Sequence, residues 1–230
     1  QRTFQLDAAI RSLEENVAEC DFVVECASSA VVPEVVEACV RHGRDCLIMS
    51  VSGLVEHLAL LEKAKAARVR VRIPSGAICG LDGIRAAMEA GLHRVTLTTR
   101  KPPRGLQDAS ILESTGVDLS NLTEQKVLFE GNALEAARVF PGNINVAGVL
   151  SILGVGPVET HVRVVADPNA TENTHEVLAE GAFGRLHTIT NNLPSPRNPK
   201  SSYMASLSAV AELRLATLEF AAHQAEASKQ

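Results

Sequence analysis

The residue best suited to take part in a reaction is His175, at the end of the segment ADPNATENTH that begins at Ala166. A strand pattern stops at Asp167-Pro168, and Asn173 is a natural N-cap, so the pattern predicts a short helix over 173–180 with His175 in its first turn. The amino terminus of a helix lowers the pKa of a histidine and keeps its imidazole neutral. We therefore expect acid–base chemistry at His175, although a histidine that merely begins a helix is the simpler alternative.

Two polar loops are expected to converge on His175. One is the Asn-rich turn at 141–145, and the other is the proline-rich segment NNLPSPRNPKSS at 191–202. The second segment holds cationic and hydroxyl groups rigidly between prolines: Arg197, Lys200, Ser201 and Ser202. Such an array of donors suits a carboxylate, but a stiff linker between domains explains the same residues without a ligand.

A glycine-rich turn, SGAICGLDG at 75–83, offers a place where a ligand could approach the backbone. It follows a predicted strand, and ligands of open α/β sheets bind beyond the carboxyl ends of the strands. Its glycines at 76, 80 and 83 match neither G-x-G-x-x-G nor a Walker A loop. An ordinary strand-to-helix turn is the alternative interpretation.

Composition excludes several classes of function. A net charge of -5 and an aromatic content of 3% disfavour nucleic-acid and anionic-membrane partners. The polar amino terminus and the lack of a long apolar stretch predict a cytoplasmic protein. Five cysteines without C-x-x-C spacing predict reduced thiols and no metal site, and H-E-x-x-H and G-x-S-x-G motifs are absent. The PPRG turn at 102–105 forms a small basic cluster with Arg100, Lys101 and its own Arg104, and this cluster is interpreted as a solvated loop.

The alternation of short apolar runs with helical patterns predicts an α/β fold. Buried strands are expected at 21–26, 46–50 and 69–73, with helices at 32–42 and 54–67, which predicts parallel β-α-β units. The following residues predict an α+β domain with a mostly antiparallel sheet: strands at 93–99, 127–130, 160–167 and 185–191, and helices at 133–139, 146–153 and 173–180. A long helix at 204–225 closes the chain. The domain prediction is an incomplete Rossmann-type unit (1–72 with 203–230) and a catalytic, dimerising unit (73–202).

Taken together, six segments resemble the L-aspartate dehydrogenase family in order and spacing. They are DFVVECAS (21–28), IMSVSGL (48–54), IPSGAICGLDGIRAA (73–87), FPGNINVAG (140–148), VVADPNATENTHE (164–176) and NNLPSPRNPKSS (191–202). The resemblance covers nearly the whole chain. It implies an NAD(P)-dependent oxidoreductase that converts L-aspartate to iminosuccinate, which hydrolyses to oxaloacetate and ammonia.

The resemblance also implies roles for individual residues. His175 corresponds to the family's active-site histidine, and Ala77 and Asn145 correspond to residues that contact NAD or NADP. Lys200 and Ser201 are our own candidates for binding the substrate carboxylates. A homodimer is expected as well.

One departure from the family pattern concerns the start of the chain. The family begins with a strand and a G-x-G-x-x-G turn that seats the pyrophosphate, and the first strand here corresponds to a later one. A shortened form of the enzyme is therefore expected, with its activity in question. The alternatives are a non-catalytic regulatory protein that keeps the dimer domain, and a related dehydrogenase acting on another small acid. Titration with NADH distinguishes the regulatory protein from the enzyme, because tight binding of NADH by this chain would contradict the regulatory alternative.

Overall fold

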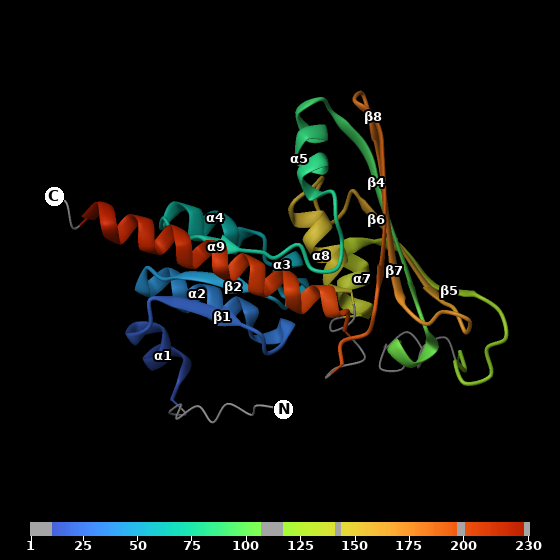
Figure 1. The fold of residues 1–230 in the computed structure, drawn as a ribbon, viewed down its shortest axis with the longest axis horizontal. Helices are drawn as coiled ribbons and strands as arrows, with labels where there is room; N and C mark the ends of the chain where they lie inside the picture. The colour runs from blue at the N-terminus through green and yellow to red at the C-terminus, as the bar shows by residue number, and fades with distance from the viewer. Residues whose placement is uncertain (1–10, 107–116, 141–143, 197–200, 228–230) are drawn as a thin grey trace.

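Two sheets organise the protein. The computed structural model describes residues 11–106, 117–140, 144–196 and 201–227. Within these residues one sheet has three strands and the other has five, and Figure 1 shows the two sheets lying beside one another with a long carboxyl-terminal helix running along the smaller one. The predicted α/β fold, a Rossmann-like parallel unit followed by an α+β unit, is confirmed.

The smaller sheet is parallel and has the order β1-β2-β3. Its strands are β1 (Phe22–Glu25), β2 (Asp45–Ile48) and β3 (Val71–Arg72). The helices of this unit are α1 (Leu13–Glu19), α2 (Val32–His42), α3 (Ser52–Val55) and α4 (Ala59–Ala66), and a 3-10 turn, η1 (Ser29–Val31), precedes α2. Helix α2 has the predicted bounds, and it ends as expected at Gly43, whose φ of 63° is a left-handed conformation that favours glycine. The helix predicted over 54–67 is instead divided into α3 and α4.

The larger sheet has the order β5-β6-β4-β7-β8. Its strands are β4 (Leu92–Lys101), β5 (Lys126–Asn132), β6 (Thr160–Ala166), β7 (Asn173–Gly181) and β8 (Gly184–Asn192). Strands β4 and β6 are parallel, whereas the other neighbouring pairs are antiparallel. The mostly antiparallel sheet is thus as predicted.

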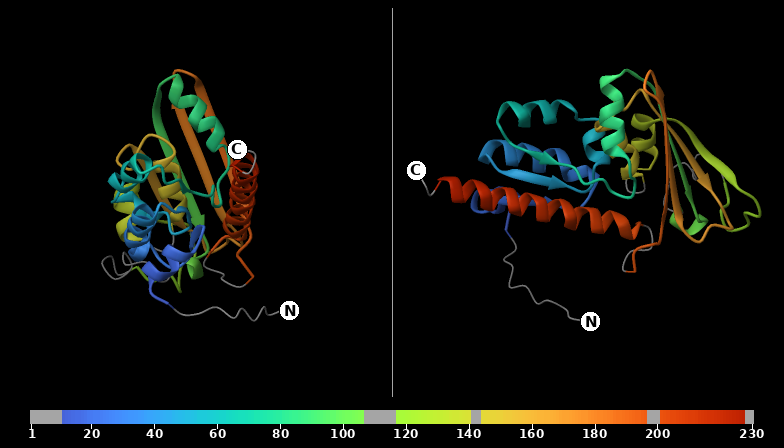
Figure 2. Two further views of the ribbon diagram at one scale, coloured as in Figure 1. Left: turned by 90° about the vertical axis from the view of Figure 1, so that its left-hand side faces the viewer. Right: turned by 45° about the horizontal axis from the view of Figure 1, so that its top comes forward.

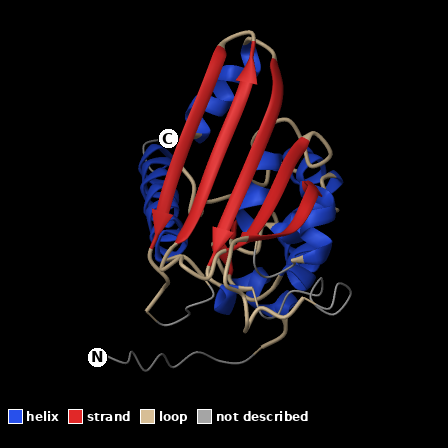
Figure 3. Cartoon of the chain, turned by 90° about the vertical axis from the view of Figure 1, so that its right-hand side faces the viewer, coloured by secondary structure: helices blue, strands red, loops and turns tan. Residues whose placement is uncertain are grey.

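Helices cover one face of the larger sheet, while Figure 3 shows that none of the described helices covers its other face. The elements of this layer are α5 (Leu81–Glu89), α7 (Ala133–Val139) and α8 (Asn145–Ile152), and a short turn, η2 (Pro103–Gly105), follows β4. The buried core between sheet and helices includes Phe140, Leu97 and Leu150. Phe140 also meets Phe129 edge to face, with ring centroids 5.8 Å apart.

One predicted helix is wrong: residues 173–181 form strand β7, an interior strand of the larger sheet that lies between β4 and β8. The segment NTHEVLAEG contains helix-forming Glu, Leu and Ala, and its asparagine resembles an N-cap. Its burial nevertheless alternates with a period of two, because Asn173, His175, Val177 and Ala179 face the core. Pairing with β4 and β8 on both sides overrides the local helical preference.

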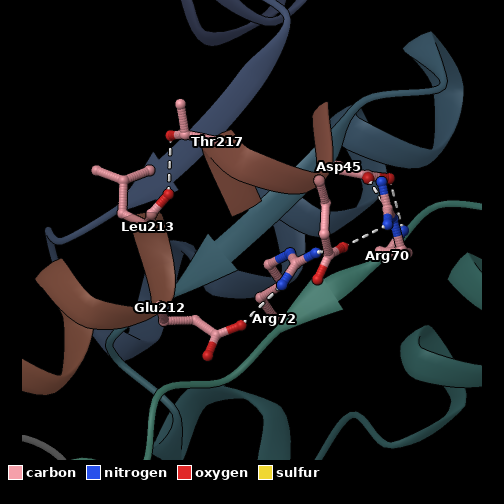
Figure 4. A network of polar contacts seen from close by, with 7 residues as sticks. Asp45, Arg70, Arg72, Glu212, Leu213 and Thr217 are labelled. Carbon is pink, nitrogen blue, oxygen red and sulfur yellow. Dashed lines mark hydrogen bonds and ion pairs between the residues drawn. The ribbon is translucent and has the colours of Figure 1, made fainter. Parts of the chain in front are cut away.

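The carboxyl-terminal helix α9 (Tyr203–Ala227) runs from the larger sheet along the parallel sheet, as Figures 1 and 2 show. Arg72 of β3 pairs with Glu212 at 2.9 Å and also with Glu219. Arg70 joins Glu219 to Asp45, so that three elements share one ionic network (Figure 4). These ion pairs fix the helix against the edge strand of the parallel sheet. None of the described helices has the length and apolar character needed to cross a membrane.

Candidate active site

His175 lies near the start of the interior strand β7, on the face that the helices cover. It is directly opposite Thr99 of β4 and Thr190 of β8. Only 3% of its surface is exposed, and its Nδ1 atom is 3.2 Å from the hydroxyl oxygen of Thr99. The predicted location in the first turn of a helix is therefore wrong, because the ring is fixed by a cross-strand neighbour.

Polar residues gather around His175 at one corner of the helix-covered face. Strand β4 places Val95, Leu97 and Thr99 on this face, and its last residue, Lys101, continues the same alternation. The neighbouring strands contribute side chains from the same end of the sheet. We call this group the polar corner; its members are Thr99, Lys101, Asn173, His175, Thr190 and Asn192. Buried apolar residues, among them Val95, Leu97 and Val177, lie on the same face, so this concentration of polar groups marks the corner as a candidate site for chemistry.

Burial changes the pKa of both titratable groups in the polar corner. Desolvation lowers the pKa of His175 to about 3, and the positive charge of Lys101 lowers it further. Desolvation also lowers the pKa of Lys101 to about 8. The imidazole is thus neutral at physiological pH, as expected from the sequence, but the cause is burial in a sheet and not a helix terminus.

Lys101 is a residue whose surroundings the sequence interpretation missed. It was expected in a solvated loop with Arg100 and Arg104, yet it ends β4 with only 4% of its surface exposed. Arg104 is exposed as expected, and Arg100 points to the opposite face, where it lies 3.9 Å from Asp167. The period-two burial of β4, extended by two residues, was the signal that could have placed Lys101 inside.

A cavity of about 510 Å³ opens at the carboxyl ends of the parallel strands. Its walls come from the segments that follow β1, β2 and β3, from α8 and from the start of α9. The lining residues are Cys26, Ala27, Ser28, Ser29, Met49, Ser50, Val51, Pro74, Gly76, Ala77, Asn145, Val146, Val149, Ser201, Ala205 and Ser206. Ala77, Asn145 and Ser201, which the sequence singled out, thus line one cavity. Lys200 lies outside the described residues.

Glu25, which the sequence interpretation did not select, shapes two walls of this cavity. Its carboxylate is 4% exposed and accepts hydrogen bonds from the amides of Ala27 (2.7 Å) and Ser50 (2.9 Å). It also accepts a hydrogen bond from the Ser50 hydroxyl at 3.0 Å. The buried carboxylate therefore fixes the turns after β1 and β2 relative to each other.

Hydrogen bonds connect the cavity to the polar corner. The carbonyl oxygen of Ala77 accepts hydrogen bonds from the Thr190 hydroxyl (2.7 Å) and from Asn192 Nδ2 (3.1 Å). Farther along this turn, Gly80 has a φ of 79°, and a Cβ there would lie 2.9 Å from the Thr188 methyl group. The glycine-rich turn therefore needs glycine for its backbone conformation and for its close approach to β8.

Asn145, the first residue of α8, is oriented by α3. Its Oδ1 atom accepts hydrogen bonds from the backbone amide (3.1 Å) and the hydroxyl (2.9 Å) of Ser52. Because Ser52 occupies the amide oxygen, the Nδ2 group is the part of this side chain that can donate to a ligand. Asn145 thus joins the two units of the fold at the cavity wall.

The lining of the cavity fits the nicotinamide end of NAD or NADP. Small side chains and backbone groups allow a flat ring to approach closely, and Asn145 provides an amide that can bind a carboxamide or a ribose hydroxyl. The place in the fold also agrees, since the cavity lies beyond the carboxyl ends of parallel strands. Residues 73–77 connect this region directly to the polar corner.

Comparison with known proteins identifies the same two units. Residues 1–74 match the NAD-binding domain of homoserine dehydrogenase, and residues 82–216 match the carboxyl-terminal domain of aspartate dehydrogenase. L-aspartate dehydrogenase of Methanosarcina barkeri is 44% identical over 90% of this chain and 77% of the relative. The corresponding protein of Bradyrhizobium diazoefficiens is 41% identical over 84% of this chain and 69% of its own length.

Solved structures agree with the sequence matches. Aspartate dehydrogenase of Thermotoga maritima superposes with a TM-score of 0.68 at 29% identity, covering 93% of this chain and 80% of the other. A hyperthermophilic archaeal homoserine dehydrogenase in complex with NADPH has a TM-score of 0.56 at 11% identity, which shows a common fold only. The resemblance inferred from six sequence segments is confirmed: this chain belongs to the aspartate dehydrogenase family.

Proposed function

We propose that this chain is an NAD(P)-dependent L-aspartate dehydrogenase. The reaction takes a hydride from Cα of L-aspartate and a proton from its amino group, giving iminosuccinate; water then releases oxaloacetate and ammonia. The observation that carries the proposal is the direct connection, through Ala77 and Thr190, between the cavity of the parallel unit and a buried, neutral His175. The family's named enzymes support the same reaction.

The cofactor supplies the hydride acceptor, and the chain's own residues arrange the substrate and water around it. Ala77 and Asn145 line the cavity and are proposed to hold the nicotinamide end. His175 is proposed to bind the water that attacks the imine carbon and to transfer its proton. Because Thr99 contacts Nδ1, the other ring nitrogen, Nε2, is the one proposed to face the reacting atoms. Lys200 and Ser201 remain proposed contacts of the substrate carboxylates.

We also propose the division of the chain into a cofactor unit (1–72 with 203–230) and a catalytic unit (73–202). The ion pairs of Arg72 with Glu212 and Glu219 support the assignment of α9 to the cofactor unit. A homodimer is proposed as well, with a second copy covering the open face of the larger sheet (Figure 3). Ile189 projects from this face and is 54% exposed. An Ile189→Asp variant should sediment as a monomer if this face is the interface. A cytoplasmic location stays a prediction.

The test of the proposed function is reduction of NAD(P) by L-aspartate. The protein should be expressed with whatever sequence its gene places ahead of Gln1, and NAD(P)H formation should be followed with L-aspartate, D-aspartate and L-glutamate. The proposal predicts turnover with L-aspartate. Binding of NADH without turnover of any of these amino acids would support instead a regulatory protein or a dehydrogenase for another acid.

A further inference from the structure

We propose that the buried carboxylate of Glu25 makes the cavity selective for the oxidised, cationic form of the nicotinamide ring. The inference rests on the proposed NAD(P)-dependent oxidation of L-aspartate, because that proposal places the nicotinamide end of the cofactor in this cavity. The oxidised ring carries a positive charge that the reduced ring lacks. A fixed negative charge beside the cavity therefore favours the form of the cofactor that accepts the hydride.

Glu25 is the last residue of β1 and lies directly behind the cavity wall. Two residues that line the cavity, Ala27 and Ser50, are bonded to its carboxylate. The backbone amide of Ala27 donates to Oε1 at 2.7 Å, and the backbone amide of Ser50 donates to Oε2 at 2.9 Å. The charge thus lies one hydrogen bond away from the residues of the wall, although only 4% of the surface of Glu25 is exposed.

The donors around Glu25 suit the anionic form of its side chain. Each carboxylate oxygen accepts a hydrogen bond from a backbone amide, which can only donate, and Oε1 also accepts one from the Ser50 hydroxyl at 3.0 Å. Hydrogen bonds from neutral donors stabilise a carboxylate without cancelling its charge. A glutamine would turn its own amide group toward one of the two backbone amides, so the geometry favours glutamate.

The described part of the cavity wall offers no charge that competes with Glu25. The described lining residues are serines, an asparagine, and small or apolar side chains, and none of them is acidic or basic. Glu25 also takes part in none of the ion pairs that the described residues form with one another. Its negative charge is therefore available to a cationic ligand in the cavity.

The experiment measures the Kd of the oxidised and of the reduced cofactor by titration calorimetry. The protein carries whatever sequence its gene places ahead of Gln1, and whichever of NAD and NADP binds more tightly is used. We expect Glu25→Gln to raise the ratio of the oxidised to the reduced Kd about three- to thirtyfold. This is the effect expected of opposite unit charges that are close but not in contact within a protein.

Two further variants separate charge from geometry. Glu25→Asp keeps the negative charge on a shorter side chain, so it should weaken both forms of the cofactor by a similar factor and leave the ratio nearly unchanged. Glu89→Gln removes an exposed acid at the end of α5 and should change neither Kd. A structural role of Glu25 alone would move both constants together and would not move their ratio.

A cofactor analogue tests the same charge in wild type, whether or not Glu25→Gln folds. Benzamide adenine dinucleotide has a neutral benzene ring in place of the cationic pyridinium ring, and it keeps the planar shape and the carboxamide. We expect wild type to bind this analogue about three- to thirtyfold more weakly than oxidised NAD. A folded Glu25→Gln protein should bind the two nearly equally.

The outcomes distinguish this inference from the proposed function. The inference is overturned if Glu25→Gln keeps the wild-type ratio, or if wild type binds the neutral analogue as tightly as oxidised NAD. An equally large change of the ratio in Glu25→Asp would overturn it too, because geometry and not charge would then be the cause. Binding of the oxidised form that depends on Glu25, without any oxidation of L-aspartate, would contradict the proposed function alone.

Discussion

Thr99 and His175 face each other across β4 and β7, with the threonine hydroxyl 3.2 Å from Nδ1 of the imidazole. Both side chains are buried, so the hydroxyl takes the place of solvent as the partner of that nitrogen. The contact restrains the orientation of the imidazole ring and leaves Nε2 as the nitrogen that this hydrogen bond does not engage. A cross-strand pair of this kind positions a side chain more rigidly than a loop can.

Replacement of Thr99 by valine should therefore impair the reaction without weakening cofactor binding. Valine has a similar shape but cannot hold Nδ1, so the ring loses its orientation and kcat should fall roughly tenfold or more. Steady-state kinetics and NADH titration measure the two effects. Thr98→Val, on the opposite face of the same strand, is the matched control and should be nearly silent. An unchanged kcat in Thr99→Val would show that the contact has no positioning role.

The low pKa of His175 predicts a dependence of stability on pH. Its pKa is about 3 in the folded protein and 6.5 in the unfolded chain, so between these values the unfolded state binds a proton that the folded state does not. The free energy of unfolding should consequently decrease as the pH falls below about 6.5, by up to about 1.4 kcal/mol per pH unit from this group.

The His175→Asn variant isolates this contribution. Denaturant titrations between pH 7 and 4 should give a smaller loss of stability for the variant than for wild type, whatever its stability at pH 7. Parallel curves for the two proteins would mean that His175 titrates normally and is not desolvated.

A side chain larger than that of Ala77 should hinder binding of the cofactor at the proposed nicotinamide site. Ala77 is 2% exposed, and its side chain lines the cavity. An Ala77→Val variant adds two methyl groups there and should raise the Kd of NADH at least tenfold. Ala90→Val, at the exposed end of α5, adds the same volume away from the cavity and should leave the Kd unchanged. Tight NADH binding by a folded Ala77→Val protein would remove Ala77 from the cofactor site.

The network in Figure 4 predicts a difference between two neighbouring arginines. The Arg72 side chain is 13% exposed and pairs with Glu212 and Glu219, whereas the Arg70 side chain is 48% exposed. Loss of the more buried cation removes the ion pairs with both Glu212 and Glu219, so Arg72→Met should lower the free energy of unfolding by about 1–3 kcal/mol. Arg70→Met should cost less than about 1 kcal/mol. Equal effects in urea denaturation would contradict this assignment.

Much of the fold was predictable because its local signals agree with its tertiary packing. Helix α2 has the predicted bounds because a strong apolar stripe ends at Gly43, and the strand at Phe22–Glu25 is a plain apolar run. Strand β7 was not predictable in the same way, since its helix-forming residues conflict with pairing that only distant strands provide.

The candidate site also combines residues that the sequence identified with residues that only the structure revealed. The resemblance selected His175, Ala77 and Asn145, and the structure places the last two in one cavity that hydrogen bonds join to the strand beside His175. Lys101 and Glu25 are buried at the ends of strands, and the burial of a charged residue is not predictable from the sequence alone. A lysine at a strand end next to Pro102 is expected to be exposed to solvent, and only the positions of the neighbouring strands show that it is buried.

Transfer of deuterium from Cα of L-aspartate to the cofactor is the decisive measurement for the proposed oxidation. The protein is incubated with L-[2-²H]aspartate and oxidised NAD or NADP, and the reduced cofactor is analysed by mass spectrometry, with His175→Ala as the comparison. An L-aspartate dehydrogenase should give a reduced cofactor that carries the deuterium, and His175→Ala should lower the rate by orders of magnitude. Reduced cofactor without deuterium, or no reduction by L-aspartate in a protein that binds NADH, would contradict it.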